Sequence, residues 1–126
     1  MLREVKTEKA PLPVGHYSQG IINDNLLFVS GQIPLDPSTN KLVKEFDDAC
    51  IQALDNMLAV VEAGGSSLKQ IINIKIYITD ISLFAKFDEI YKQYLGDHRP
   101  ARAVIGVSEL PKKAQIEVEA IAAIKD

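Results

Sequence analysis

One arginine stands at the entrance to a segment that otherwise avoids water. Arg102 precedes the apolar residues AVIGV within RPARAVIGV, residues 99–107. A guanidinium group offers a rigid fork of N–H donors that grips a carboxylate with two hydrogen bonds, which lysine cannot reproduce. Glu117 lies in a second apolar segment, QIEVEAIAAI at 115–124, and a glutamate in a partly buried cleft can orient water and carry its protons. These residue types allow two interpretations: an ion pair between subunits, which is the more common role, or an anion-binding site.

The other reactive residue types give weaker indications. Cys50 falls on the apolar face of a predicted helix, where a free cysteine packs as a small and inert hydrophobic residue. His16 and His98 have no further ligand residues at useful spacing, so we expect no metal site. A single cysteine cannot form an internal disulfide and fits a reducing compartment.

Apolar periodicity predicts the elements that must position these residues. Alternation predicts strands over 25–33, 70–79, 101–107 and 115–124, with room for a further short strand near the N-terminus. Spacings of three and four predict helices over 45–63 and 83–95. Ser82 is the expected cap of the second helix, and Gly64-Gly65 ends the first. The expected fold class is α/β (α+β), a single sheet with two helices on one face.

Strand alternation also assigns side chains to the two faces of the sheet. In the strand at 70–79, one face is expected to carry Ile72, Ile74, Ile76 and Ile78. In the strand at 25–33, one face is expected to carry Leu27, Val29 and Gly31, and the other Leu26, Phe28, Ser30 and Gln32.

The last two strands are apolar on both faces, which is typical of strands covered on both sides. Two helices cover only one face, so we predict a homo-oligomer whose interface is the open face of the sheet. We expect Arg102 and Glu117 to point to that open face, with the helices on the isoleucine face.

Length and composition limit the remaining possibilities. The chain has 126 residues with a net charge of −3, and we expect one domain over 1–126. The acidic balance weighs against nucleic acid as a partner, because such binding depends on neutralising phosphates. The N-terminal segment has no apolar core of a signal peptide, and the apolar runs are far shorter than the about 20 residues of a membrane span. We expect a cytoplasmic protein with no membrane partner.

Six short motifs extend these inferences. They are GHYSQG (15–20), VSGQIPLDP (29–37), LDNMLAVVEAGG (54–65), PAR (100–102), LP (110–111) and IEVEAIA (116–122). Their order and spacing over essentially the whole chain closely resemble the Rid family, the RidA/YjgF reactive-intermediate deaminases. The resemblance implies a chorismate-mutase-like fold and a homotrimer with an inner barrel and clefts between subunits. It further implies hydrolysis of enamines and imines, such as 2-aminoacrylate and 2-iminobutanoate, to 2-keto acids and ammonia without a metal or organic cofactor.

The resemblance also implies roles for individual residues. The substrate-carboxylate arginine of the family falls on Arg102 and its acidic residue on Glu117. The motif tyrosine, serine and following glycine fall on Tyr17, Ser30 and Gly31. A backbone amide used for substrate binding falls near Val104.

This sequence departs from the family pattern at several positions. His16 replaces a proline, Val104 replaces a cysteine, and the segment between Tyr91 and Arg102 is shorter than in some members. Asp88 stands where many deaminating members have asparagine, and a negative charge in the cleft would weaken binding of an anionic substrate. Two other functions remain open: a regulatory protein that senses keto acids or amino acids in the same clefts, and a ribonuclease. The acidic balance and the lack of a paired-histidine arrangement weigh against the ribonuclease.

Overall fold

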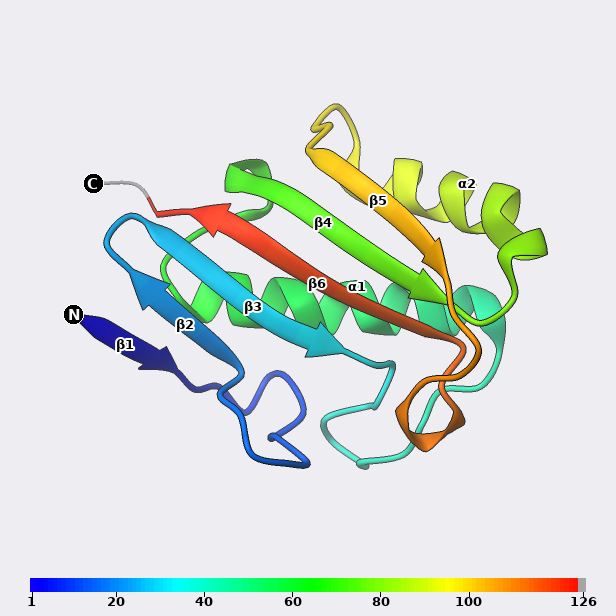
Figure 1. The fold of residues 1–126 in the computed structure, drawn as a ribbon, viewed down its shortest axis with the longest axis horizontal. Helices are drawn as coiled ribbons and strands as arrows, with labels where there is room; N and C mark the ends of the chain where they lie inside the picture. The colour runs from blue at the N-terminus through cyan, green and yellow to red at the C-terminus, as the bar shows by residue number, and fades with distance from the viewer. Residues whose placement is uncertain (125–126) are drawn as a thin grey trace.

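The computed structural model describes residues 1–124 and shows one sheet with two helices packed against one face (Figure 1). The strands are β1 (Leu2–Val5), β2 (Gly20–Asn23), β3 (Leu26–Gln32), β4 (Ile71–Ile78), β5 (Ala101–Gly106) and β6 (Ile116–Ala123). The helices are α1 (Phe46–Ala63) and α2 (Phe84–Leu95), and short 3₁₀ turns span Leu68–Gln70, Ile81–Leu83 and Pro111–Lys113. The predicted strands and helices are all present, and the N-terminal region holds two short strands. None of the helices in residues 1–124 is long and apolar enough to cross a membrane.

The strands follow the order β1-β2-β3-β6-β4-β5 across the sheet. Only β4 and β5 run parallel, and α2 forms the crossover that a parallel pair requires. The last strand, β6, lies between β3 and β4 in the middle of the sheet. β5 therefore forms one edge of the sheet, with α2 beside it (Figure 1).

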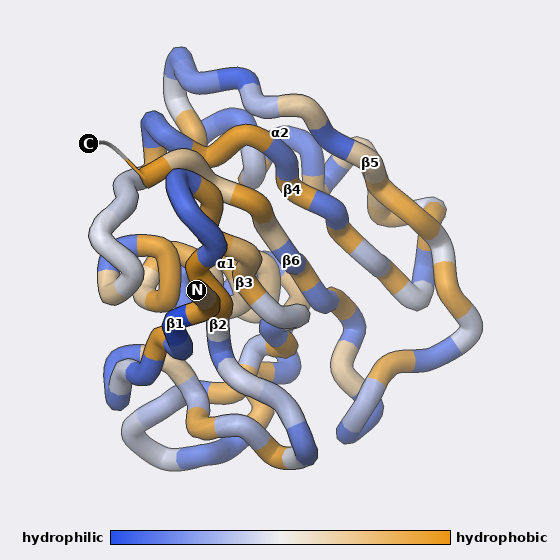
Figure 2. The backbone as a smooth tube through the Cα atoms, turned by 60° about the vertical axis from the view of Figure 1, so that its left-hand side comes forward, coloured by the Kyte–Doolittle hydropathy of each residue, from blue (hydrophilic) through white to orange (hydrophobic). Residues whose placement is uncertain are grey.

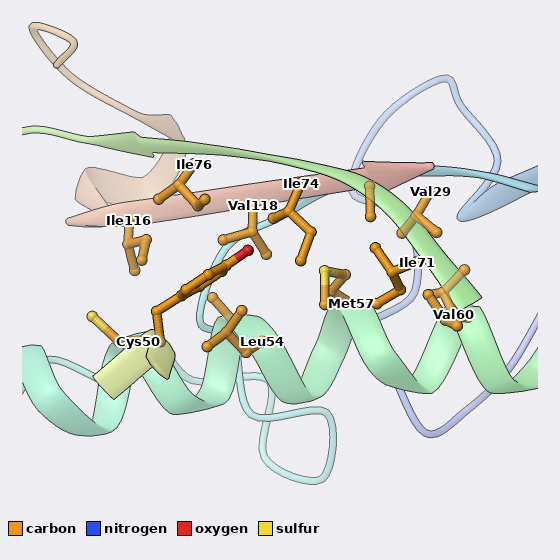
Figure 3. Packing of buried hydrophobic residues seen from close by; sticks show 14 of the residues in the cluster. Val29, Cys50, Leu54, Met57, Val60, Ile71, Ile74, Ile76, Ile116 and Val118 are labelled. Atoms are coloured by element: carbon orange, nitrogen blue, oxygen red, sulfur yellow. The ribbon is translucent and has the colours of Figure 1, made fainter. Parts of the chain in front are cut away.

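The apolar face of α1 packs against the sheet and forms the core (Figure 3). Glu45 caps the helix, because its side chain accepts a hydrogen bond from the Asp48 N–H at 2.9 Å. The helix ends at Ala63, and Gly65 takes a left-handed φ of 89°, which fits the prediction for this glycine pair. The fully buried residues of α1 that face the sheet include Cys50, Leu54, Met57 and Val60.

The isoleucine face of β4 differs from the prediction at one position. Ile74, Ile76 and Ile78 are fully buried under the helices as expected, but Ile72 is 45% exposed. A register shift between Ile71 and Asn73 turns Ile71 into the core in its place. The assignment of Ile72 to the buried face was wrong, because one irregular residue reverses the alternation before it.

A second register shift changes the end of β3. Leu27 and Val29 are buried, and Leu26 and Phe28 are exposed, as predicted. Between Val29 and Gln32 the pairing with β6 slips, so that Gln32 comes opposite the buried Val118 and is itself only 5% exposed. The prediction that Gln32 shares the face of Phe28 was therefore wrong. The prediction that Gly31 shares the face of Leu27 and Val29 was wrong for the same reason, because Gly31 lies against Glu117 instead of in the core.

The start of α2 also differs from the prediction. Ser82 does not cap α2, whose N-cap position is Leu83 without a side-chain cap. Asp80 instead caps the preceding turn: its carboxylate accepts hydrogen bonds from the Ser82 N–H at 3.0 Å and from Ser82 Oγ at 2.6 Å. These bonds stabilise the 3₁₀ turn Ile81–Leu83, and α2 begins only at Phe84. Asp80 and Ser82 both have side chains that can cap a helix, and the turn is capped by Asp80.

The second face of the sheet has no covering helix. Phe28, Ile72 and Ile105 are 42%, 45% and 38% exposed, and Figure 2 shows β5 mainly in hydrophobic colours, with one hydrophilic stretch near its start. Glu117 lies on this open face, opposite Tyr77 of β4. Arg102 does not: it pairs with Ile74, whose side chain is buried beneath the helices. Arg102 and Glu117 therefore point to opposite faces of the sheet, and the prediction of a shared face was wrong.

Candidate functional site

The first candidate site is an open pocket of about 360 Å³ around Glu117, which we call the Glu117 pocket. It lies where the loop before β2, the irregular end of β3 and the start of β6 meet. The lining residues are Pro11, Leu12, Val14, Tyr17, Ser30, Gly31, Gln32, Ile33, Leu35, Pro111 and Glu117. Tyr17, Ser30, Gly31 and Glu117, four of the residues singled out from the sequence, thus come together in space.

Glu117 depends on the glycine beneath it. A Cβ atom added to Gly31 would lie 2.5 Å from Glu117 Oε2, which is closer than two such atoms can approach. The glycine therefore allows the carboxylate to lie against the strand backbone. Burial in this position, and secondarily the charge of Glu119, raise the pKa of Glu117 above its usual range. A carboxylate with a raised pKa is a better proton acceptor than an exposed glutamate, which suits it to proton exchange with water or a ligand.

Ser30 and Tyr17 have defined hydrogen-bond roles in the Glu117 pocket. Ser30 Oγ donates to the Ser18 carbonyl at 2.6 Å, so its lone pairs remain to accept from a ligand or water. The Tyr17 hydroxyl accepts from the Val14 N–H at 3.3 Å, which leaves its own proton to donate. Together the two hydroxyls offer a ligand one acceptor and one donor.

Gln19 is a positioning residue that sequence reasoning missed. Its side chain is 2% exposed, and it follows Tyr17 by two residues. Gln19 Oε1 accepts from the Thr7 N–H at 2.8 Å, and Nε2 donates to the carbonyls of Thr7 at 3.0 Å and Pro11 at 2.9 Å. A loop without regular structure needs such partners for its backbone. The only sequence signal is an amide within the Pro- and Gly-rich segment 11–20.

The second candidate site surrounds Arg102 on the helix-covered side of the sheet. Arg102 Nη1 donates to Asp88 Oδ1 at 2.5 Å, and the two form an ion pair. The guanidinium carbon lies 4.9 Å from the ring centre of Tyr91 and 5.6 Å from that of Phe84. Aromatic rings attract a cation at these distances, so two rings of α2 help to hold the guanidinium.

A pocket of about 470 Å³ opens beside this ion pair, and we call it the Arg102 pocket. Its lining residues are Asp88, Tyr91, Lys92, Leu95, Gly96, His98, Arg99, Pro100 and Arg102. Val104 lies two residues further along β5 on the same face, partly buried. The Val107 N–H bonds to the Ile78 carbonyl at 2.9 Å, so alternation along the strand turns the Val104 N–H away from β4, toward the free edge.

The predicted site residues thus form two groups rather than one. Tyr17, Ser30 and Gly31 accompany Glu117, whereas Arg102 and Val104 lie on the other face with α2. Within one chain, a ligand held by Arg102 does not reach Glu117, because the sheet separates the two side chains.

The residues given weaker indications take other places. Cys50 is fully buried, and burial raises the pKa of its thiol to about 12, so it stays a protonated, inert group as predicted. His98 Nε2 donates to the Ile71 carbonyl at 2.8 Å and is half-buried in the loop before β5. Within residues 1–124, no three histidine, cysteine, aspartate or glutamate side chains gather as metal ligands.

Comparison with known proteins decides the family. Residues 7–124 match the family model described as Endoribonuclease L-PSP. The chain belongs to this family. It is the YjgF/RidA group, which confirms the resemblance noted from the six motifs.

Similar proteins come from archaea and bacteria. A RutC family protein of Pyrococcus horikoshii is 46% identical over 97% of this chain and 98% of its own. TdcF of Escherichia coli, which is named as a reactive intermediate deaminase, is 38% identical over 97% of each chain. A crystal structure of TdcF with bound serine has a TM-score of 0.94, at 36% identity over 98% of this chain and 99% of that one.

The fold is that of the family as well. The crystal structure of the YjgF gene product of Escherichia coli has a TM-score of 0.94 at 35% identity, over 98% of this chain and 99% of that chain. The six-stranded sheet with two helices is therefore the YjgF fold, and the predicted α/β class is confirmed. The naming of TdcF supports a reactive-intermediate deaminase as the general activity of such proteins.

Proposed function

We propose that this protein hydrolyses short-chain 2-imino acids and their enamine tautomers, such as 2-iminobutanoate and 2-aminoacrylate, to 2-keto acids and ammonia. One observation carries the proposal. The chain has an arginine in one pocket and a glutamate with a raised pKa in another, on opposite faces of its sheet, and these residue types suit carboxylate binding and proton transfer. The deaminase name of a relative that is 38% identical supports the reaction class.

The active site in this proposal lies between subunits. A second copy of the chain would bring the Glu117 pocket of one subunit to the Arg102 pocket of the next, which a single chain cannot do. The exposed apolar side chains of Phe28, Ile72 and Ile105 support a covered open face, because such a patch is typical of an interface. A homotrimer with three clefts is the arrangement that the Rid resemblance implies.

The proposed reaction uses side chains and water alone. Arg102 grips the substrate carboxylate, which fixes the imine carbon next to it. Water adds to that carbon, and Glu117 accepts a proton from the water and returns it to the nitrogen. Glu117 then carries the hydroxyl proton of the resulting carbinolamine to its nitrogen, the C–N bond breaks as the C=O bond forms, and ammonia and the keto acid leave.

The other residues of the two pockets hold the reacting groups. Ser30 Oγ accepts from the attacking water or the imine N–H, and Tyr17 donates its free proton to the same region. Gly31 leaves space for the Glu117 carboxylate. The Val104 N–H, at the free edge of β5, adds a donor for the substrate carboxylate.

The test couples this protein to a threonine dehydratase that generates 2-iminobutanoate. We expect keto-acid release to exceed the uncatalysed rate, and Arg102→Ala and Arg102→Lys both to lose this acceleration, because lysine keeps the charge without the fork. Unchanged rates in both variants would remove Arg102 from the site. Light scattering that reports a monomer at assay concentration would contradict the cleft between subunits.

A regulatory sensor of small acids is the second candidate function. A structure of the relative TdcF with bound serine favours it, since a stable amino acid occupies that protein without an imine. Calorimetric binding of a keto acid or amino acid without any turnover of the imine would favour the sensor. A ribonuclease, which the family description names, fits poorly with a net charge of −3.

A further inference from the structure

Arg102 already has a carboxylate partner in this protein. Asp88 Oδ1 lies 2.5 Å from Nη1, and the two side chains are 46% and 26% exposed. The rings of Phe84 and Tyr91, 5.6 Å and 4.9 Å from the guanidinium carbon, help to hold the arginine beside Asp88. A guanidinium has five N–H donors, and the Asp88 bond uses one of them, so a ligand carboxylate can still bind.

The charges around the Arg102 pocket are unequal. Lys92, Arg99 and Arg102 provide positive charge, whereas Asp88 is the one acidic residue among those that line it. Lys92 and Arg99 are exposed at the rim, where they attract anions of any kind. Asp88 contacts the gripping arginine itself, so its charge acts on whatever the arginine holds.

A second carboxylate beside this ion pair meets two opposing effects. Arg102 attracts it, but the Asp88 carboxylate repels it. Repulsion between two negative charges a few ångströms apart strongly disfavours ligands that cannot offset it. A ligand with a protonated nitrogen next to its carboxylate removes that repulsion, because the N–H donates to Asp88 while the carboxylate binds the guanidinium. An α-keto acid has no such donor.

We propose that Asp88 makes the Arg102 site select 2-amino and 2-imino acids with a protonated nitrogen over 2-keto acids of the same carbon skeleton. The proposal rests on the carboxylate-binding role given to Arg102 in the proposed function. It also implies how the cycle ends. Deamination converts a ligand with a cationic nitrogen into a plain anion, and Asp88 then favours release of the product.

The test uses two stable ligands that differ only at the second carbon, L-2-aminobutanoate and 2-oxobutanoate. Isothermal titration calorimetry measures the affinity of the full-length protein for each. We expect the unaltered protein to prefer the amino acid. Asp88→Asn keeps the shape and removes the charge, so it should strengthen keto-acid binding by about tenfold or more, the range of one charge-assisted contact, and weaken amino-acid binding.

The matched control is Glu89→Gln, which changes the net charge equally. Glu89 is exposed on α2 and does not line the Arg102 pocket. We expect this control to leave the ratio of the two affinities within about twofold, as for surface changes in general. The proposal is overturned if Asp88→Asn changes both affinities by the same factor or leaves both unchanged. It is also overturned if the unaltered protein binds neither ligand, or binds the keto acid as tightly as the amino acid.

Imine turnover, measured separately, distinguishes this proposal from the proposed function. A reversed ligand preference in Asp88→Asn without turnover in the unaltered protein would support selection by Asp88 in a sensor and reject the deaminase. Turnover with an unchanged ligand preference would reject the role of Asp88 and leave the deaminase in place. Arg102→Ala should abolish binding of both ligands, and retained binding in that variant would overturn selection at this site.

Discussion

The Glu117 pocket and the Arg102 pocket are built from opposite kinds of backbone. Irregular chain forms the Glu117 pocket: a loop held by Gln19, a register shift in β3, and a glycine beneath the carboxylate. Regular structure forms the Arg102 pocket, where an edge strand in even register lies beside a helix. The comparison teaches that the position of Glu117, the group proposed to move protons, depends on several individual backbone irregularities. The position of Arg102, the group proposed to bind the carboxylate, requires only a regular strand and a helix.

The largest expected effect is a loss of activity when Gly31, beside Glu117, is replaced. In Gly31→Ala the new Cβ would lie 2.5 Å from Glu117 Oε2, so the carboxylate must move. We expect keto-acid release to fall by about 100-fold or more, the loss associated with a displaced general acid–base. Ligand binding at Arg102 should persist, because Gly31 does not line the Arg102 pocket.

The control for this variant is Gly15→Ala. A Cβ at Gly15 meets the Tyr17 ring at 3.7 Å, an ordinary contact, so its activity should stay near that of the unaltered protein. Equal activity in the two alanine variants would show that Glu117 does not need the space above Gly31.

A smaller effect is expected where the loop is anchored. Gln19→Leu would leave the Thr7 and Pro11 carbonyls without their donor, so the free energy of unfolding should fall by about 1–3 kcal/mol. Urea denaturation measures it. Gln93→Leu, on the exposed side of α2, should change stability by about 0.5 kcal/mol or less. If the two variants unfold at the same urea concentration, the loop does not depend on Gln19.

The smallest expected effect concerns pH. Burial first, and then the charge of Glu119, raise the pKa of Glu117 above 4.5. The folded state therefore binds the Glu117 proton more tightly than the unfolded chain does. This contribution to the free energy of unfolding is fully present below the unfolded-state pKa, and it is lost as pH rises through the folded-state pKa. Glu117→Gln should then be more stable than the unaltered protein at pH 7, and this advantage should shrink toward pH 4.

Glu109→Gln provides the matched comparison, because it removes one charge from an exposed loop. Urea unfolding at both pH values tests the pair. If the stability difference between Glu117→Gln and the unaltered protein is equal at pH 4 and pH 7, the pKa of Glu117 is not raised by its pocket.

The elements were predictable because long periodic segments leave little choice. The helix at 45–63 and the strand at 70–79 appear within one or two residues of their predicted bounds. The errors at Ile72 and Gln32 both come from register shifts, which insert no visible signal into the alternation. The face of the sheet that Arg102 points to was predicted wrongly for a different reason. Both faces of 101–107 are apolar, so only the register with β4 decides which face the helices cover.

The candidate site was predictable as a set of residues but not as a geometry. The motifs pointed to Tyr17, Ser30, Gly31 and Glu117, and the structure brings these four together. The motifs could not show that Asp88 pairs with Arg102, because the contact joins a helix to an edge strand. Gln19 was missed because its role depends on carbonyl groups up to twelve residues away.

The central place of β6 has a consequence for how the protein is made. Residues 116–123 pair with both β3 and β4, so the sheet stays in two separate parts until this segment has been synthesised. A growing chain on the ribosome therefore exposes two unpaired apolar strand edges, which are prone to aggregation, after both helices already exist. The sheet becomes continuous only when β6 has left the ribosome and paired with both β3 and β4.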